Sequence, residues 1–143
     1  MAKNDYSWWR ERFQILFRLV DIVRVDHFRG FESFWEVPAT AKTAAKGRWV
    51  KGPGAAFFRV LEKHLGKLPI IVEDLGIITW EVEDLKYELG YPGIKVLHFS
   101  FQRDVNGCCL PIHYEKNLAV YTGTHDNNTT CGWYAALSEE QPE

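Results

Sequence analysis

The chain has 143 residues, of which 46% are hydrophobic and 25% are charged, and its formal net charge is −2. This composition predicts one folded domain with a hydrophobic core and excludes a disordered chain. The slightly acidic balance argues against a nucleic-acid or membrane partner, because nucleic acids and anionic membranes both select basic surfaces.

A helix and a strand are predicted in the first part of the chain. Large apolar residues recur at helical spacing over residues 8–20, with charged residues between them. A short β-branched segment at 21–28 follows and predicts a strand. Pro53-Gly54 opens a second helical stretch at 55–65, which Gly66 is well placed to end.

The second part of the chain continues the alternation of helices and strands. An apolar segment at 68–72 predicts a strand. Thr79 could then cap a third helix, which Gly90-Tyr91-Pro92 would end. Segments 93–99 and 118–122 predict two further buried strands.

Short buried strands separated by helices indicate an α/β fold with a parallel sheet and crossover helices. A doubly wound open sheet and a (β/α)8 TIM barrel both have this pattern. The sequence has no GxGxxG or GxxxxGK[ST] motif, so the nucleotide-binding versions of the open sheet lose support. Because a complete barrel takes about 250 residues, the chain is expected to form roughly half a barrel.

Acidic residues follow three of the predicted strands, at Asp26, Glu73 and Asp126. Catalytic groups of a barrel lie at the carboxyl ends of its strands, so these acids are expected to meet in one cleft. Side chains alternate along a strand, so Arg24 and Asp26 should share a face. By the same parity, Ile71 and Glu73 should also share a face.

Convergent carboxylates suit the chemistry of glycosidic bonds, which needs one ionised nucleophile and one protonated general acid. Arg24 would keep Asp26 charged and oriented, as a nucleophile requires. Glu73 emerges from an apolar run, and such surroundings favour a protonated carboxyl. Glu73 is therefore the better candidate for the acid.

Other interpretations remain open at this point. Each acid taken alone also fits a structural ion pair or a helix cap. A metal-dependent barrel hydrolase could use Asp26, His27, His125 and Asp126 as ligands, although no HxH or HExxH spacing occurs. A non-catalytic sugar-binding module would need the aromatic rings, which are 15% of the chain, but not the acids.

Histidines and tryptophans outside these segments have simpler interpretations. His64, His98 and His113 are expected to be surface or packing residues. For any one of the six tryptophans, a place in the core is the better expectation.

Several motifs resemble those of the 4-alpha-glucanotransferases, also called amylomaltases or disproportionating enzymes. In chain order they are RVDHFRGF at 24–31, FWEVPA at 34–39, GRW at 47–49, GPG at 52–54, IVEDLG at 71–76, YPGIKVL at 91–97 and YTGTHDN at 121–127. The resemblance covers residues 8–133, nearly the whole chain. One departure is Asn128, where the family more often has Asp.

The resemblance implies that residues 1–143 are a fragment of one catalytic domain, holding the fourth to seventh strands of an α-amylase-like barrel. It also implies a role for each site residue. Asp26 matches the nucleophile, Glu73 the general acid/base and Asp126 the aspartate that stabilises the transition state. Arg24 and His125 match residues that position the nucleophile and bind the sugar.

The implied activity moves an α-1,4-glucan segment from a maltooligosaccharide or starch-derived donor to a glucose or glucan acceptor. The implied mechanism is a retaining double displacement through a covalent glycosyl-enzyme, without a cofactor or a metal. An α-amylase-clan hydrolase is the closest alternative. Because four barrel strands are missing from these residues, the fragment alone is expected to be inactive.

Cysteine usage and the chain start bear on location. Cys108, Cys109 and Cys131 form neither a disulfide framework nor a zinc pattern, since their number is odd and no CxxC occurs. No signal peptide and no apolar run of about 18 residues is found. A cytoplasmic protein with reduced thiols is expected, or a plastid protein if the source is a plant.

Overall fold

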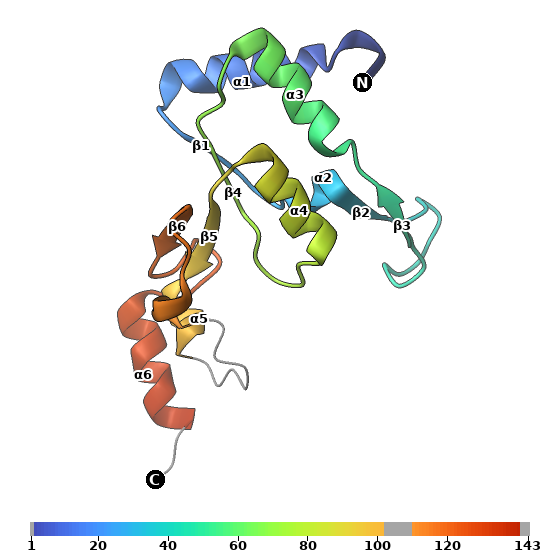
Figure 1. The fold of residues 1–143 in the computed structure, drawn as a ribbon. Helices are drawn as coiled ribbons and strands as arrows, with labels where there is room; N and C mark the ends of the chain where they lie inside the picture. The colour runs from blue at the N-terminus through green and yellow to red at the C-terminus, as the bar shows by residue number, and fades with distance from the viewer. Residues whose placement is uncertain (1, 102–109, 141–143) are drawn as a thin grey trace. The chain divides into compact units, whose positions relative to one another are not determined.

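A computed structural model describes residues 2–101 and 110–140 and has an α/β fold (Figure 1). The chain divides into two compact units, Met1–Gly93 and Ile94–Glu143. Cys108 and Cys109, to which no role is assigned, lie outside the described residues. Within the described residues, no helix is both long enough and apolar enough to span a membrane.

The first unit is built around two parallel strands, as predicted. β1 (Val23–Val25) pairs with β4 (Ile70–Val72), and Val25 lies opposite Val72. The long crossover between them contains α2 (Arg29–Glu32), β2 (Ser33–Glu36), β3 (Arg48–Lys51) and α3 (Gly54–Leu65). A crossover of this kind is what a parallel pair requires.

Three helices cover the parallel strands. α1 (Ser7–Leu19) packs on α3, and α3 packs on α4 (Trp80–Leu89), as Figure 1 shows. Their apolar faces meet the strands in one buried cluster, which includes Phe13, Val23, Val25, Phe28, Phe57, Phe58, Leu61 and Val72. The strand valines therefore point toward the helices, which leaves the alternate side chains for the other face.

The three predicted helices of the first unit are confirmed, and each observed end lies within one residue of its predicted position. Gly66 ends α3 with φ of 78°, and Gly90 ends α4 in the left-handed conformation. Both positions use the freedom of glycine at positive φ. Thr79 stands at the N-cap position of α4, but its side chain makes no capping hydrogen bond, so the expected cap is wrong in detail.

The strands are shorter than predicted. Segment 21–28 is extended only at Val23–Val25, because His27 has a φ of 50° and Arg29 already begins α2. Segment 68–72 forms β4 only from Ile70, since Pro69 has no N–H for a ladder. The carbonyl of Pro69 still accepts a hydrogen bond of 3.0 Å from the Val23 amide.

An antiparallel hairpin of β2 and β3 was not predicted. It pairs Trp35 with Trp49, whose ring centroids lie 5.4 Å apart, and both rings are exposed. The expectation that a given tryptophan lies in the core is wrong for four of them, namely Trp8, Trp35, Trp49 and Trp80. Phenylalanine supplies the aromatic core instead.

The second unit contains a strand pair and two helices. β5 (Gly93–Val96), which begins at the last residue of the first unit, pairs with β6 (Leu118–Tyr121). The predicted strand at 93–99 is wrong beyond Val96, where α5 (Leu97–Ser100) begins. Short apolar runs do not distinguish a strand from a helix, which explains the error.

The C-terminal helix α6 (Thr130–Glu140) was not predicted. Its local signal is Thr129, whose Oγ1 accepts a 3.2 Å hydrogen bond from the Gly132 amide, as in an N-cap. The side chain of Trp133 on this helix stacks on buried His98 at 4.5 Å. The interpretation of His98 as a packing residue is therefore confirmed.

The 3-10 helices Ala2–Asn4 and Pro111–His113 complete the described elements.

Candidate active site

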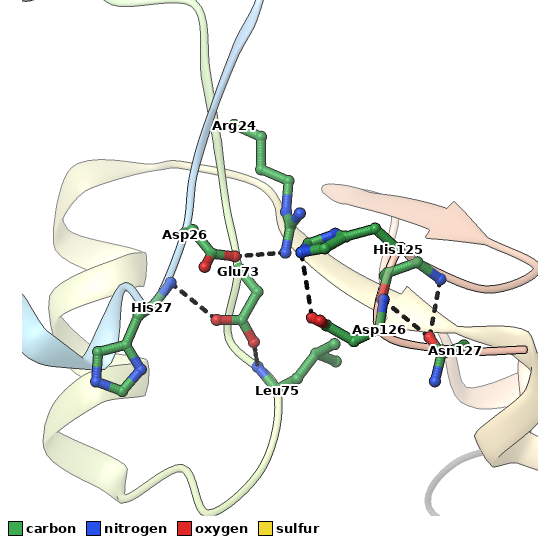
Figure 2. A network of polar contacts seen from close by, with 9 residues as sticks. Arg24, Asp26, His27, Glu73, Leu75, His125, Asp126 and Asn127 are labelled. Atoms are coloured by element: carbon green, nitrogen blue, oxygen red, sulfur yellow. Dashed lines mark hydrogen bonds and ion pairs between the residues drawn. The ribbon is translucent and has the colours of Figure 1, made fainter.

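Asp26 and Glu73 directly follow the paired ends of β1 and β4. Beyond the Val25–Val72 pair, the Glu73 amide donates to the carbonyl of Val25 at 2.9 Å, so the ladder continues to the acids. Arg24 and Asp26 are accessible whereas Val25 is buried, and Glu73 is half-buried. The expected parity is therefore observed, and Figure 2 shows both carboxylates on the same side of the strand pair.

This register sets the scale of the separation between the two acids. Neighbouring strands of a sheet lie about 4.8 Å apart. Carboxyl groups of retaining glycosidases stand about 5–5.5 Å apart, so both values belong to one range. Side chains that leave adjacent strands at the same level can therefore flank one anomeric carbon.

Arg24 holds the carboxylate of Asp26. Its guanidinium donates to Asp26 Oδ1 at 2.6 Å, as expected from their positions two residues apart on one strand. The Asp26 side chain is 67% exposed, so the ion pair contributes little to folding stability. Its main consequence is to orient the carboxylate at the end of β1.

Glu73 is held by two backbone amides. Its Oε2 accepts from the His27 amide at 2.9 Å, and its Oε1 accepts from the Leu75 amide at 2.7 Å (Figure 2). The sequence predicted apolar surroundings for Glu73, but its carboxyl oxygens contact polar backbone amides. Each oxygen has a second lone pair, so it can accept a further hydrogen bond.

Asp74 lies on the opposite face from Glu73 and is buried. Its Oδ2 accepts from Lys86 Nζ of α4 at 2.7 Å, and the same Nζ lies 2.6 Å from Glu83 Oε2. Burial alone would lower the pKa of Lys86, but the hydrogen bonds and charges of Asp74 and Glu83 raise it. Gly93 leaves the space that the Asp74 carboxylate fills, since a Cβ there would overlap it.

Arg29 connects the segments that follow β1 and β4. Its guanidinium donates to the carbonyl of Ile77 and lies over the ring of Trp49, 4.4 Å from the centroid. The sequence placed Arg29 in a motif but gave no reason for this contact. The only signal in the sequence is that the Arg29 side chain is long enough to reach a neighbouring segment.

Asp126 lies in the second unit, in a turn that follows β6. Asn127 Oδ1 accepts from the amide and the hydroxyl of Thr124, at 2.8 and 2.9 Å. The Asp126 amide in turn lies 3.3 Å from Thr124 Oγ1. His125 Nε2 is 3.4 Å from Asp126 Oδ2, and both side chains are exposed. The convergence of Asp126 with Asp26 and Glu73 stays a prediction.

Possible metal ligands are not grouped in the described residues. Over 2–101 and 110–140, no three His, Cys, Asp or Glu side chains come together in a way that could hold a metal ion. Nothing in this part of the chain favours the alternative of a metal-dependent hydrolase.

Comparison with known proteins gives a consistent result. A family model described as 4-alpha-glucanotransferase matches residues 1–143. The chain is 52% identical over 145 residues to a 4-alpha-glucanotransferase of Synechocystis, covering 100% of this chain and 29% of that protein. It is 46% identical over 141 residues to a chloroplastic/amyloplastic 4-alpha-glucanotransferase of Arabidopsis thaliana, covering 99% of this chain and 24% of that protein.

A solved structure has a similar fold. The amylomaltase from Streptococcus agalactiae, in complex with acarbose, superposes with a TM-score of 0.88 at 38% identity. The match covers 97% of this chain and 28% of that protein. This chain thus spans less than a third of the length of each of these relatives.

Proposed function

The chain belongs to the 4-alpha-glucanotransferase family, and we propose that the whole protein that carries it transfers α-1,4-glucan segments between maltooligosaccharides. The observation that carries the proposal is the register of β1 and β4, which places Asp26 beside Glu73. Two carboxyl groups on neighbouring strands of one sheet suit a retaining glycosidic reaction, in which such groups stand about 5–5.5 Å apart.

Within the whole protein, residues 1–143 form part of one catalytic (β/α)8 barrel. Strands β1, β4, β5 and β6 correspond to its fourth to seventh strands. The parallel pairing of β1 with β4 and the long crossover through α3 support this assignment. The remaining strands come from sequence outside this chain, so the 143 residues alone are inactive.

In the first displacement, Asp26 is the nucleophile and Glu73 is the general acid. Asp26 attacks the anomeric carbon of the donor, and the bond from that carbon to the glycosidic oxygen breaks. Glu73 gives its proton to the departing oxygen. The ion pair with Arg24 supports this role for Asp26, because it orients the carboxylate. The product is a β-linked glycosyl-enzyme.

In the second displacement, Glu73 is the general base. It takes the proton of the acceptor 4-hydroxyl, which attacks the anomeric carbon as the ester bond to Asp26 breaks. The α configuration is restored and both carboxyl groups regain their starting forms. No cofactor or metal takes part. Transfer prevails over hydrolysis if the bound acceptor excludes water from the intermediate.

Asp126 and His125 act on the sugar rather than on the departing oxygen. Asp126 stabilises the oxocarbenium-like transition state through the sugar hydroxyls, and His125 binds the same ring. The turn supports these roles, because His125 and Asp126 lie between Thr124 and Asn127, which it joins, and the Asp126 amide donates to Thr124 Oγ1.

The donor is a maltooligosaccharide or a starch-derived α-1,4-glucan, and the acceptor is glucose or another glucan. The protein acts in the cytoplasm, or in a plastid if its source is a plant. The chloroplastic/amyloplastic location in the name of the Arabidopsis relative supports the second possibility.

Incubation of the whole protein with maltotriose tests the proposal. A transferase yields glucose together with oligosaccharides longer than maltotriose. Release of glucose and maltose without longer products would identify a hydrolase and overturn the proposed transfer. The purified 143-residue chain provides the matched comparison, and it should produce neither set of products.

A further inference from the structure

The ladder between β1 and β4 is interrupted at His27. Alternate residues of β1 bond the facing strand, since the Val23 amide donates to Pro69 and the Val25 carbonyl accepts from Glu73. The next residue in this series is His27, whose amide should donate to the carbonyl of Glu73. That carbonyl instead accepts from Phe28, at 3.0 Å. His27 is therefore an extra residue in the ladder, as in a β-bulge.

Because of the interruption, the His27 amide does not donate to the ladder, and it donates to the side chain of Glu73 instead. The His27 amide donates to Glu73 Oε2 at 2.9 Å, while the Leu75 amide donates to Oε1 at 2.7 Å. One oxygen is thus held from the segment after β1 and the other from the segment after β4. Two fixed donors on opposite oxygens define the plane and the direction of the carboxyl group.

The left-handed conformation of His27 produces this arrangement. Its φ of 50° is uncommon for a residue with a side chain, although His adopts it more often than most. The imidazole ring is not the donor. It lies against Gly30, where an added Cβ would be 3.2 Å from the ring, and Figure 2 shows it pointing away from Glu73.

A second contact holds the same two segments together. The Arg29 guanidinium donates to the carbonyl of Ile77, two residues beyond His27 on one side and four beyond Glu73 on the other. The segment that contains the His27 amide is therefore also joined, through Arg29 and Ile77, to the segment that follows Glu73. Backbone strain that persists in such a place is commonly connected with function.

We propose that His27 is a positioning residue, whose left-handed backbone aims the carboxyl group of Glu73 at the glycosidic oxygen. The proposal rests on the proposed function of Glu73 as general acid/base. It assigns the effect to the backbone conformation of His27 and not to its imidazole.

Substitutions at His27 in the whole protein separate these two possibilities. His27→Gly and His27→Asn remove the imidazole but keep access to positive φ. His27→Val disfavours positive φ, because its side chain is β-branched. We therefore expect His27→Gly and His27→Asn to retain most of the turnover of maltotriose. His27→Val should lower kcat at least about 100-fold, the smallest contribution typical of a general acid, with little change in KM.

A second donor and acceptor distinguish misplacement of the acid from general damage. α-Maltosyl fluoride reacts with Asp26 as the carbon–fluorine bond breaks, and fluoride leaves without needing a proton. Azide then attacks the anomeric carbon and releases Asp26 without giving up a proton. Neither step uses Glu73, so His27→Val should form maltosyl azide at nearly the rate of the unsubstituted protein.

Three results would overturn the assignment of His27. The first is an equal loss of maltotriose turnover and of maltosyl azide formation in His27→Val. The second is a loss of maltotriose turnover in His27→Asn and His27→Gly that is as large as in His27→Val. The third is full turnover of maltotriose by His27→Val. An unsubstituted protein that converts neither maltotriose nor the fluoride would instead end the proposed function, and the inference with it.

Discussion

The acids of the two units are held in different ways. Asp26 and Glu73 stand at the ends of paired strands, 47 positions apart in the sequence, and their places depend on the core beneath β1 and β4. Asp126 stands in a turn in which the hydrogen bonds of Thr124 join residues only two or three positions apart.

The difference shows two ways of positioning a proposed catalytic group, by long-range strand pairing and by a local turn. Strand register is fixed over the whole pair, because a slip of one residue would turn every side chain to the other face. A turn closed by one asparagine depends on few atoms. Changes in the first unit should therefore affect chemistry and stability together, whereas changes in the turn should mainly affect chemistry.

The largest effect is expected at the two strand ends. In the whole protein, Asp26→Asn and Glu73→Gln should each lower turnover of maltotriose by about 10³-fold or more, because in the proposed mechanism each removes a group that takes part in bond making or breaking. Initial rates of glucose release measure the loss.

Asp74→Asn is the matched control, since Asp74 is adjacent in sequence but faces the core. It should reduce turnover less than Glu73→Gln. A normal rate for Asp26→Asn would show that another residue is the nucleophile.

The buried ion pair of Asp74 with Lys86 should contribute more to folding stability than the exposed ion pairs do. Lys86→Met removes the cation that pairs with the buried carboxylate of Asp74, and breaking a pair of this kind costs about 3–5 kcal/mol of unfolding free energy. The double variant Asp74→Leu/Lys86→Met should recover most of the loss, because neither charge then remains buried. Urea unfolding measures both.

The ion pair of Arg59 with Glu88 provides the control for this prediction. Its side chains are 59% and 51% exposed, and such pairs contribute little to stability. Arg59→Ala should therefore leave the unfolding midpoint unchanged. Equal losses for Arg59→Ala and Lys86→Met would remove the distinction between the buried and exposed pairs.

A smaller effect is expected in the turn of the second unit. Asn127→Ala removes the acceptor of two hydrogen bonds from Thr124. If the transition state loses about 1.4 kcal/mol, the value of one good hydrogen bond, kcat falls about tenfold. The unfolding midpoint should stay the same. A large drop in that midpoint would contradict the local character of the turn.

The smallest effect concerns alkaline pH and the first unit. Burial raises the pKa of Tyr91 above its ordinary value of 10.0, and the neighbouring carboxylate of Glu62 adds to the rise. The folded state thus keeps a proton that the unfolded chain releases. Its contribution to stability is complete below about pH 10 and is lost as the pH rises toward the folded-state pKa.

Tyr91→Phe tests this dependence, because it removes the titrating hydroxyl and keeps the ring in the core. Between pH 8 and pH 11, the urea midpoint of the variant should fall less than that of the unsubstituted protein. Equal falls would show that Tyr91 does not contribute to the alkaline loss.

Sequence reasoning recovered the features that depend on periodicity. The helices at Ser7–Leu19 and Gly54–Leu65 were predicted from apolar spacing, and the face shared by Arg24 and Asp26 from strand alternation. The same alternation separates Glu73 from Asp74, which turns into the core. These features repeat along the chain, so a local pattern contains them.

Features that depend on single backbone conformations or on tertiary contacts were not predicted. The positive φ of His27 ends β1 early, and no pattern in its neighbours indicates it. The partners of Glu73 are amides, which the identities of neighbouring side chains do not specify. The helix that begins at Leu97 replaces the end of the strand predicted at 93–99, because an apolar run fits both.

Mass spectrometry of a trapped intermediate tests the central claim most directly. The Glu73→Gln variant of the whole protein, given α-maltosyl fluoride, should form the ester without acid assistance and hydrolyse it slowly. Peptide mapping should then find one maltosyl group, attached to Asp26. A maltosyl group on any other residue, or release of a product with inverted configuration and no ester, would contradict the account.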